Sequence, residues 1–509
     1  MSLKNHNVLS KEPLSKKARW SLLATVATAL LLITLDNSIL YTALPTLVEE
    51  LGATSNQMLW IINAYPLVMA GLLLGSGTLG DKVGHDRMFV TGMILFAIGS
   101  GIAAFAPTSE VLIAARAGLA IGAAAMMPAT LALIRVNFKN ERERTAAIAI
   151  WGSVSILGVS LGPIIGGTLL EFFWWGSVFL LNVPIVILGL IAFKLIKVKN
   201  EKNHDKHWDF ISSVYAMVGL VGLVLAIKEI AHVPPSIPVV LVSLIASIAG
   251  IVLFIRRQNK LKHPLLDFDI FKNRAFTGSV IAAMLTMFTV GGIQLATTQR
   301  FQLVENFSAL QAGLLVGALA LGTLPTAAIA GAFLHKLGLR NIIAIGLGLA
   351  SIGGIIMIIG LQTEFWVLLT GLVVVGLGLG GPFSILSSAI TGNVPVKKAG
   401  MASSVEEVSF ELGSLTAVSI LGSVLTAVYT ASVVLPDGTP AIAQDSLSKA
   451  IETANGNTEI INAAASAYDY AYLVTLTVTT VILVMGAIIT GFILKKYGPG
   501  TKSQLHSEH

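Results

Sequence analysis

The sequence has no cysteine and few charged residues for its length. None of its 509 residues is Cys, and only 12% are Asp, Glu, Lys or Arg, whereas soluble domains carry about 25%. The absence of cysteine excludes a disulfide framework, a thiolate metal site and a catalytic thiol. The low charge and the hydrophobic content of 54% exclude an ordinary soluble domain. The composition therefore indicates an all-α polytopic membrane protein.

Motifs for metal, cofactor or ATP chemistry are also missing. The nine His residues lie in tails, linkers and loops without the spacing of a metal site, and no nucleophile is paired with a base. No Walker A motif is present, so ATP is not the expected energy source. We therefore expect no metal site, no cofactor and no enzymatic activity.

The basic residues are distributed unevenly along the chain. A net charge of +6 is compatible with a nucleic-acid partner, but the positions of the basic residues argue against one. The loops at residues 45–56 and 107–110 are acidic or neutral, which is typical of the outer side. This positive-inside bias predicts a multi-pass protein of the cell (cytoplasmic) membrane with both termini in the cytoplasm. All but four of the 33 Lys and Arg residues lie in the tails or in alternate connecting loops, the exceptions being Arg116, Lys228, Arg300 and Lys449.

Apolar runs of about 20 residues predict fourteen membrane-spanning helices. They include residues 176–196, 275–298, 309–334, 340–361, 399–430 and 468–494. We expect the chain to be organised as a cytoplasmic tail (1–19), a six-helix bundle (20–200), a linker with an inserted helix pair (201–262), a second six-helix bundle (263–494) that includes an extracytoplasmic loop (432–467), and a cytoplasmic tail (495–509).

An internal repeat supports this division. Residues 77–92 and 331–346 match at one constant offset, through the pairs Gly77/Gly331, Lys82/Lys336, Gly84/Gly338 and Gly92/Gly346. Each copy links the second and third helices of a six-helix set. Such a duplication is found in transporters whose substrate site lies between the two halves, near the middle of the membrane.

Three carboxylates lie in the apolar run at residues 399–429, namely Glu406, Glu407 and Glu411. A carboxylate at the bilayer centre costs several kcal/mol unless it is paired, protonated or beside water. At 100° per residue Glu407 and Glu411 share one helix face, and Glu406 lies a third of a turn away. The cluster predicts a binding or proton-handling site.

A glycine motif occupies residues 158–167, GVSLGPIIGG. Gly158, Gly162 and Gly166 recur at four-residue spacing, which lets another helix approach the backbone closely, and Pro163 removes one helical hydrogen bond. The fourth glycine of the motif is Gly167. Taken alone, a run of this kind is equally compatible with an ordinary packing face.

Three further segments carry charged residues at notable positions. Asp36 lies inside the first span in residues 35–45, LDNSILYTALP. The loop at 77–87 contains Asp81, Gly84 and Arg87. Arg116 is the only basic residue that this assignment of spans buries in a helix, and it needs an acceptor there. Each of these residues also has a purely structural interpretation. Asp36 could form a packing hydrogen bond, Asp81 could belong to a turn with a helix cap, and Arg116 could form a structural ion pair.

Together these four segments and the acidic cluster resemble the major facilitator superfamily. The similarity is greatest to its drug:proton antiporters with fourteen spans, which include exporters of quaternary ammonium compounds. The resemblance implies the major facilitator fold, with two six-helix bundles plus two inserted helices. It also implies that Asp36, Glu406, Glu407 and Glu411 bind cations or protons and that Arg116 takes part in proton transfer. The glycine motif and the loop at 77–87 are implied to be conformational elements.

The chain departs from that pattern in places. His85 and Asp86 stand where basic residues are usual, and Ala120 stands where the family has Gly. An exporter of this family has further carboxylates at positions that match Asn63 and Thr323 here. We therefore expect Asn63 and Thr323 to be neutral members of the substrate cavity. Three aromatic residues could also line it and stack on a cation, namely Tyr65, Trp151 and Phe410.

These features lead to a functional prediction. We expect proton-coupled efflux of lipophilic cationic drugs, dyes and antiseptics by alternating access. The acidic cluster is expected to face Asp36 and Arg116 across a central cavity. The predicted partners are small cationic substrates, protons and the lipid bilayer, and the protein is expected to function as a monomer without a nucleic-acid partner. The alternative is a proton-coupled importer or exporter of another small molecule on the same fold.

Overall fold

Long apolar runs form helices in a bilayer because a helix satisfies its own backbone hydrogen bonds. The computed structural model describes residues 14–196, 198, 209–231, 235–262, 264–395, 398–454 and 456–499. Most of the two expected tails and residues 199–208 of the first linker lie outside the described residues. The regular elements of the described residues are all helical: α1 (Lys16–Leu51), α2 (Ser55–Val83), α3 (His85–Ala104), α4 (Ser109–Asn137), α5 (Glu141–Phe172), α6 (Ser177–Leu180), α7 (Asn182–Leu195), α8 (Phe210–Ala231), α9 (Ile237–Gln258), η1 (Phe268–Lys272), α10 (Arg274–Leu303), α11 (Ala309–Gln362), α12 (Phe365–Gly392), α13 (Ala399–Ser432), η3 (Ala441–Gln444), α14 (Leu447–Ala454) and α15 (Thr458–Ile493).

The predicted number of spans is confirmed. Fourteen helical segments of the described chain are long and apolar enough to cross a membrane. The expected spans 309–334 and 340–361 join into α11, which bends at Gly338. The expected span 176–196 consists of α6 and α7, which meet at Leu181. Pro184 lies just after this break and lacks the N–H that would continue the hydrogen-bond ladder.

The sequence repeat has a structural counterpart. Gly84 (φ 111°) and Gly338 (φ 76°) both adopt a positive φ, which favours glycine, at the joint between two spans. The next paired glycines also play matching parts. A Cβ on Gly92 of α3 would lie 2.7 Å from a carbonyl oxygen of α4, and one on Gly346 of α11 would lie 2.6 Å from a carbonyl oxygen of α12.

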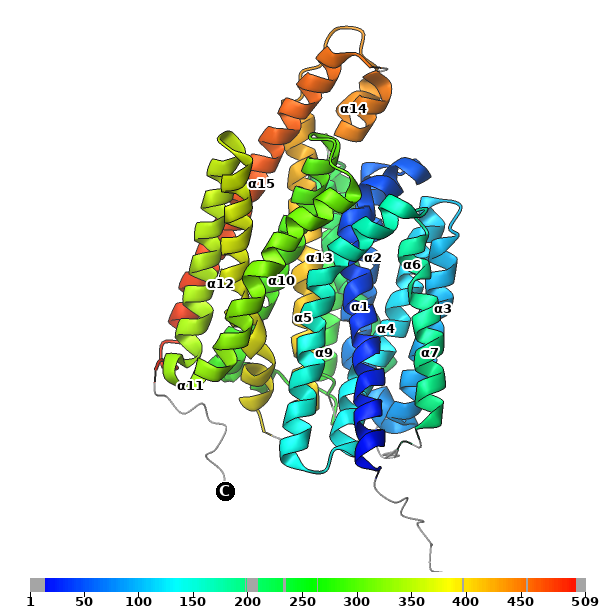
Figure 1. Ribbon diagram of the computed structural model, residues 1–509, viewed down its shortest axis with the longest axis vertical. Coiled ribbons are helices and arrows are strands. Elements are labelled where there is room, and N and C mark those ends of the chain that lie inside the picture. The colour runs from blue at the N-terminus through cyan, green and yellow to red at the C-terminus, as the bar shows by residue number, and fades with distance from the viewer. Residues whose placement is uncertain are drawn as a thin grey trace, which may run out of the picture.

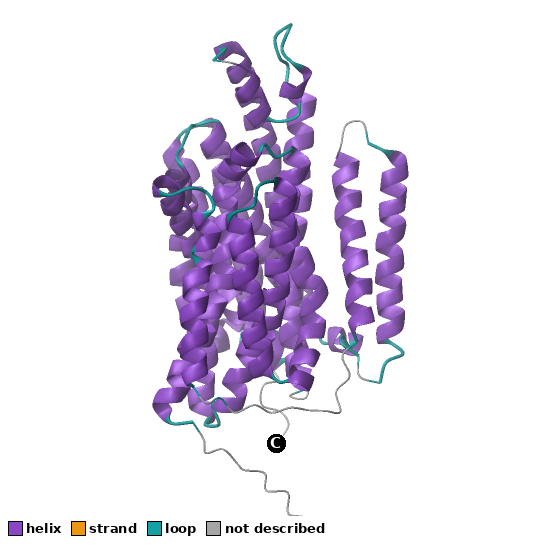
Figure 2. Ribbon diagram, turned by 90° about the vertical axis from the view of Figure 1, so that its right-hand side faces the viewer, coloured by secondary structure: helices purple, strands orange, loops and turns teal. Residues whose placement is uncertain are grey.

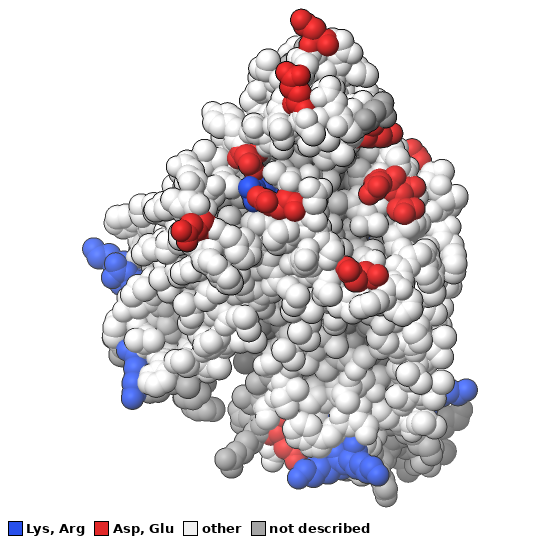
Figure 3. All heavy atoms as spheres, turned by 45° about the horizontal axis from the view of Figure 1, so that its top comes forward, with Lys and Arg blue, Asp and Glu red and all other residues white. Residues whose placement is uncertain are grey.

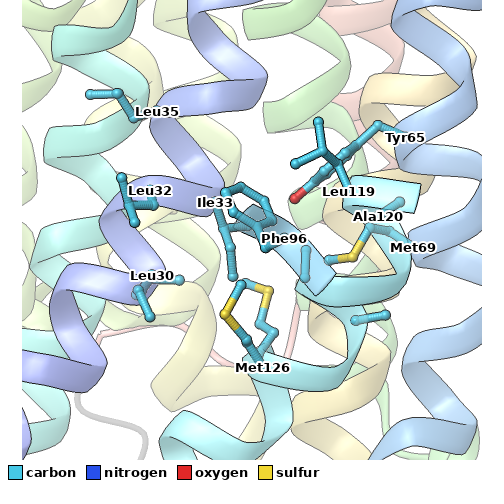
Figure 4. Close-up of a cluster of buried hydrophobic side chains, with 14 of the residues drawn as sticks. Leu30, Leu32, Ile33, Leu35, Tyr65, Met69, Phe96, Leu119, Ala120 and Met126 are labelled. Atoms are coloured by element: carbon cyan, nitrogen blue, oxygen red, sulfur yellow. The ribbon is translucent and has the colours of Figure 1, made fainter. Parts of the chain in front are cut away.

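Two large hydrophobic clusters hold the bundle together. The first draws mainly on α1–α7 and the second mainly on α10–α15. Figure 4 shows part of the first cluster, in which Ile33 of α1 lies near Phe96 of α3 and Met126 of α4. We call these two parts the N-terminal and C-terminal halves. Their domain boundaries stay a prediction.

The glycine motif of α5 packs against both halves. A Cβ on Gly158, Gly162 or Gly166 would lie 1.9, 2.5 or 2.8 Å from side-chain atoms of α1. On the other side, Gly167 lies against the first residues of α11, and the Pro163 carbonyl oxygen lies against a glycine of α11. The motif therefore brings α5 into backbone-close contact with α1 and α11 together.

The inserted pair α8–α9 lies beside the main bundle, as Figure 2 shows. Helix α8 contacts α2 and α13, through a small apolar cluster that includes Leu67, Val224 and Leu415. Helix α9 packs against α8 through glycines. A Cβ on Gly222 or Gly250 would lie 2.6 or 2.5 Å from backbone atoms of the partner helix. Helix α8 thus covers the line along which α2 meets α13.

Both described ends of the chain lie at the same end of the bundle (Figure 1). We call this end, where α1 begins and α15 finishes, the terminal side. Acidic side chains gather toward the other end, and basic side chains are visible mainly near the terminal side (Figure 3). The charge asymmetry expected from the sequence is therefore present on the face of the molecule that Figure 3 shows.

One sequence expectation is wrong at the end opposite the terminal side. Helix α10 continues past residue 298 and buries Arg300, which is 7% exposed, so Arg116 is not the only arginine buried in a helix. Arg300 tolerates burial because it pairs with Glu305 at 2.9 Å and with Asp469 at 2.8 Å. Within the loop expected over 432–467, α14 forms a short helix, and α15 already begins at Thr458, capped by Asn457; the bounds of this loop stay a prediction.

The glycine contacts predict a cost for enlarging Gly162. A methyl group at this position would lie 2.5 Å from the Ser38 Cβ, so Gly162→Ala should destabilise the folded protein by about 1–3 kcal/mol through overpacking. Thermal unfolding of the purified protein in detergent measures this. Gly101→Ala is the matched control, because a Cβ there meets nothing within 4 Å. Equal melting temperatures for the two variants would contradict the packing described for α5.

Candidate functional site

An enclosed ion pair links α1 and α4 inside the N-terminal half. The Arg116 guanidinium donates to the Asp36 carboxylate at 2.5 Å, and the two residues are 0% and 2% exposed. Asn182 of α7 donates to the other Asp36 oxygen at 2.8 Å. Arg116 also donates to the Asn37 side chain at 3.2 Å. The acceptor that a membrane-buried arginine needs is therefore Asp36.

Helix α2 completes the surroundings of Arg116. The Nε of Arg116 donates to the Ile61 carbonyl oxygen at 3.3 Å, and the Arg116 guanidinium lies 4.6 Å from the centre of the Tyr65 ring. Asn63, on the same helix, donates to Ser419 of α13 at 3.1 Å. Asn63 and Tyr65 are both 0% exposed. The structure therefore places these two predicted cavity residues in helix contacts.

A cavity of about 670 Å³ lies between the terminal-side parts of α2, α4, α5 and α13. We call it the entrance cavity. Pockets of about 300–1,000 Å³ accommodate drug-sized ligands. Trp151 of α5 lines it and donates to Thr130 at 3.1 Å. The other lining residues that bear on its chemistry are Asp81, His85, Arg135, Lys262, Asp267, Lys398 and Glu407.

A smaller pocket of about 70 Å³ lies deeper between the halves. We call it the central pocket. It has room for about two water molecules and not for a drug-sized ligand. Glu407, Phe410 and Glu411 of α13 line it together with Tyr41 of α1. Glu407 and Met127 line both spaces, so Glu407 stands at the junction between the entrance cavity and the central pocket.

The three glutamates of α13 do not all line the central pocket. Glu407 and Glu411 line the same pocket, as their spacing on one helix face predicts. Glu406, which is 5% exposed, turns instead toward α12, where it forms a hydrogen bond with Ser387, and it interacts electrostatically with Arg135 of α4. The sequence places Glu406 a third of a turn away but does not show which helix that face meets.

Glu411 is the more enclosed of the two pocket glutamates. It is 9% exposed, and one of its carboxylate oxygens has no hydrogen-bond partner among the described residues. Arg116 interacts with it electrostatically. Beside it, the Tyr41 and Ser414 hydroxyls form a hydrogen bond of 2.8 Å across the two halves. An arginine that is already paired with Asp36 thus also acts on the pocket.

The remaining predicted cavity residues lie on the C-terminal side of the central pocket. Phe410 stacks on Phe383 of α12, with ring centres 5.7 Å apart. Thr323 of α11 lines a separate small cavity with Phe383 and Gln294, and its hydroxyl donates to the Leu319 carbonyl oxygen at 2.8 Å. Gln294 also lines the central pocket. Thr323 therefore lies behind the central pocket.

The loop predicted as a conformational element lies at the mouth of the entrance cavity. Asp81 and His85 contact each other at 2.9 Å and both line the cavity. Gly84 between them ends α2, and Arg87 is exposed. His85, a departure from the family pattern, is thus one partner of Asp81.

Sequence reasoning missed Asn182, Tyr41 and Ser414. Asn182 is a lone amide in the apolar run 176–196 and is 0% exposed. A polar residue inside a span is a signal for a buried partner, so Asn182 could have been found. Tyr41 and Ser414 gave no such signal, because membrane-facing Tyr and Ser residues are common.

The comparison with known proteins decides the family. The sequence pattern of the Major Facilitator Superfamily matches residues 26–418. The chain belongs to the major facilitator superfamily. This membership confirms the resemblance inferred from the motifs, and it makes the protein a membrane transporter and not an enzyme. A solved structure of this superfamily's fold, a bacterial homologue of the human lysosomal transporter Spinster in its inward-facing and occupied conformation, superposes with a TM-score of 0.62, covers 96% of this chain and 100% of that chain, and is 15% identical.

Two superfamily members are similar over almost the whole chain. The methyl viologen resistance protein SmvA of Salmonella typhimurium is 33% identical over 491 residues, which cover 94% of this chain and 99% of that protein. The multidrug efflux pump LfrA of Mycolicibacterium smegmatis is 34% identical over 495 residues, which cover 94% and 96%.

The Asp36–Arg116 pair generates a stability prediction. Arg116→Gln leaves the Asp36 carboxylate buried without its cation, which should lower the free energy of unfolding by about 3–5 kcal/mol. Adding Asp36→Asn removes the unpaired charge, so the double variant should be more stable than Arg116→Gln alone. Thermal unfolding in detergent compares the three proteins. Wild-type stability of the single Arg116→Gln variant would contradict the ion pair.

Proposed function

We propose that the protein exports lipophilic cations in exchange for protons. The observation that carries this proposal is the position of Glu407, a membrane-embedded carboxylate shared by a drug-sized entrance cavity and a water-sized central pocket. A carboxylate at the inner end of this cavity offsets the hydration that a cation loses on entering. The deeper pocket, with Glu411, has room for water and protons only.

The relatives support the same substrate class. Their names describe resistance to methyl viologen and multidrug efflux, and methyl viologen is an organic dication. The entrance cavity also offers Trp151 as an aromatic surface, and the faces of aromatic rings attract cations. A cationic substrate supplies Glu407 with a counter-charge that can replace a proton, which an uncharged substrate does not. The geometry therefore favours a cation.

Coupling follows from competition between substrate and proton. Glu407 and Glu411 are four residues apart on one helix face and open into one small pocket. When two carboxylates lie close together in a low dielectric, ionising both of them costs free energy. Without substrate, one of the two therefore holds a proton. A cation at Glu407 displaces that proton, and a proton arriving from outside displaces the cation. One pH unit of gradient supplies about 1.4 kcal/mol per proton.

The buried pair and the neighbouring glutamate have supporting roles in this proposal. Asp36 holds Arg116 at a position from which its charge acts on Glu411. Arg116 thereby stabilises the ionised form of Glu411 when the proton leaves. Glu406, which faces Ser387 and Arg135, stabilises the α4–α12–α13 contact.

Alternating access requires the two halves to rock. Near the terminal side the entrance cavity separates them, and Gly167 of α5 meets the start of α11 toward the other end. Asp81 and Gly84 at the cavity mouth and the glycine motif of α5 are the elements that change contacts in this motion. We assign the terminal side to the cytoplasm because of its basic surface, and one copy of the chain contains the whole pathway.

Transport by inside-out membrane vesicles tests the proposal. With an imposed pH gradient, wild-type vesicles should accumulate ethidium, while Glu407→Gln and Glu411→Gln should reduce the initial rate by about tenfold or more, since each removes a proton-exchanging carboxylate. Glu229→Gln is the matched control, because Glu229 lies at the end of α8 away from the terminal side, and this variant should transport normally. Ethidium accumulation that persists after both pH gradient and membrane potential are collapsed would refute proton coupling.

A further inference from the structure

The segment that follows the inserted pair forms part of the entrance-cavity wall. Residues 259–273 run from α9 to α10, and His263 among them lies outside the described residues. We call this segment the strap. Its residues Lys262, Pro264, Leu265 and Asp267 line the entrance cavity. The inserted pair, which contacts the outside of the bundle, therefore reaches the substrate route through the strap.

One end of the strap is fixed to the inserted pair. Gln258, the last residue of α9, is 2% exposed. Its side-chain oxygen accepts hydrogen bonds from the backbone N–H groups of Leu265 at 2.7 Å and Leu266 at 3.2 Å. Its amide nitrogen donates to Ser212 of α8 at 2.6 Å. This buried amide holds the strap in a turn against α8 and α9.

The other end is fixed to the C-terminal half. The Lys398 ammonium donates to the Asp267 carboxylate, and Asn273 donates to the Asn393 carbonyl oxygen at 2.8 Å. The hydrogen bond from Lys398 lowers the pKa of Asp267. Asp267 therefore stays ionised at neutral pH, and the contact is lost only when the pH falls through its lowered pKa. The strap keeps its place across the physiological range.

The cations of the entrance cavity differ in whether they are paired. Arg135 lies 3.5 Å from the Ser403 hydroxyl and interacts with Glu406. Lys398 pairs with Asp267. Lys262 is exposed, and within the described parts of the chain it has no ion-pair partner. The strap thus presents an uncompensated positive charge to the route that a cationic substrate takes.

We propose that Lys262 is a specificity-determining residue, which disfavours highly charged cations at the entrance. This inference rests on the proposed function. The work of moving a charge past a fixed charge is proportional to the moving charge. For a separation of about 8 Å in water between the substrate and the Lys262 ammonium, removing this charge should raise the affinity for a monocation about twofold and that for a dication about fourfold or more. If Lys262 acted only by shaping the cavity, the change in affinity on its replacement would not increase with the charge of the substrate.

Transport kinetics test this selectivity. In inside-out vesicles, Lys262→Gln should lower KM about twofold for ethidium, which carries one charge, and about fourfold for methyl viologen, which carries two. Lys262→Arg keeps the charge and should resemble the wild type. Lys139→Gln is the matched control, because Lys139 is exposed near the end of α4 and does not line the cavity. Both effects should shrink in about 0.5 M salt, where charges are screened within a few ångströms.

A second measurement does not depend on transport. Because the chain has no cysteine, Thr78→Cys places a single thiol in the entrance cavity. Its reaction rates with a cationic and an anionic thiosulfonate reagent report the local potential. Adding Lys262→Gln should raise the cation-to-anion rate ratio about fourfold.

The outcomes separate the two proposals. An unchanged rate ratio, equal KM changes for both cations, or the same changes in Lys139→Gln would overturn the role of Lys262. If wild-type vesicles accumulate neither cation but the rate ratio shifts as expected, the proposed export function fails, while the charge barrier at the entrance is supported.

Discussion

The cost of placing a charged side chain in a hydrocarbon layer governs how this structure is arranged. Such a charge needs a partner, a proton or access to water. Arg116 and Arg300 have carboxylate partners. Glu406 forms a hydrogen bond with Ser387 and interacts electrostatically with Arg135. Glu407 and Glu411 meet the requirement differently, because they line spaces with room for water and ligands. In the proposed function they are therefore the carboxylates that exchange a proton for a cation.

The helix packing keeps those spaces between the halves. The glycines of α5 allow contact with α1 and α11 at distances that a larger side chain would prevent. Contacts between α5 and the start of α11 hold the halves together away from the terminal side, and the entrance cavity separates them near it. In the proposed alternating-access cycle, this asymmetry corresponds to one end state. The inserted pair adds to it by covering the α2–α13 line and by supplying the strap.

Much of the fold follows from the sequence, because each span is encoded locally. The fourteen apolar runs, the glycine joints at Gly84 and Gly338 and the shared face of Glu407 and Glu411 all depend on local composition or helical spacing. Pairing across helices is not local. The lone amide of Asn182 signals a buried partner, but the sequence does not show that this partner is Asp36 or that Glu406 faces α12. The burial of Arg300 was not predicted, because its carboxylate partners allow helix α10 to extend beyond the apolar run in the sequence.

The central claim is that a cation at Glu407 displaces a proton held by Glu407 or Glu411. Proton release during binding tests it most directly. Purified protein in weakly buffered detergent solution near pH 7 should release about one proton for each lipophilic cation bound. In the Glu407→Gln/Glu411→Gln double variant, any residual binding should release none. Cation binding to the wild type without proton release, or undiminished release by the double variant, would contradict the account.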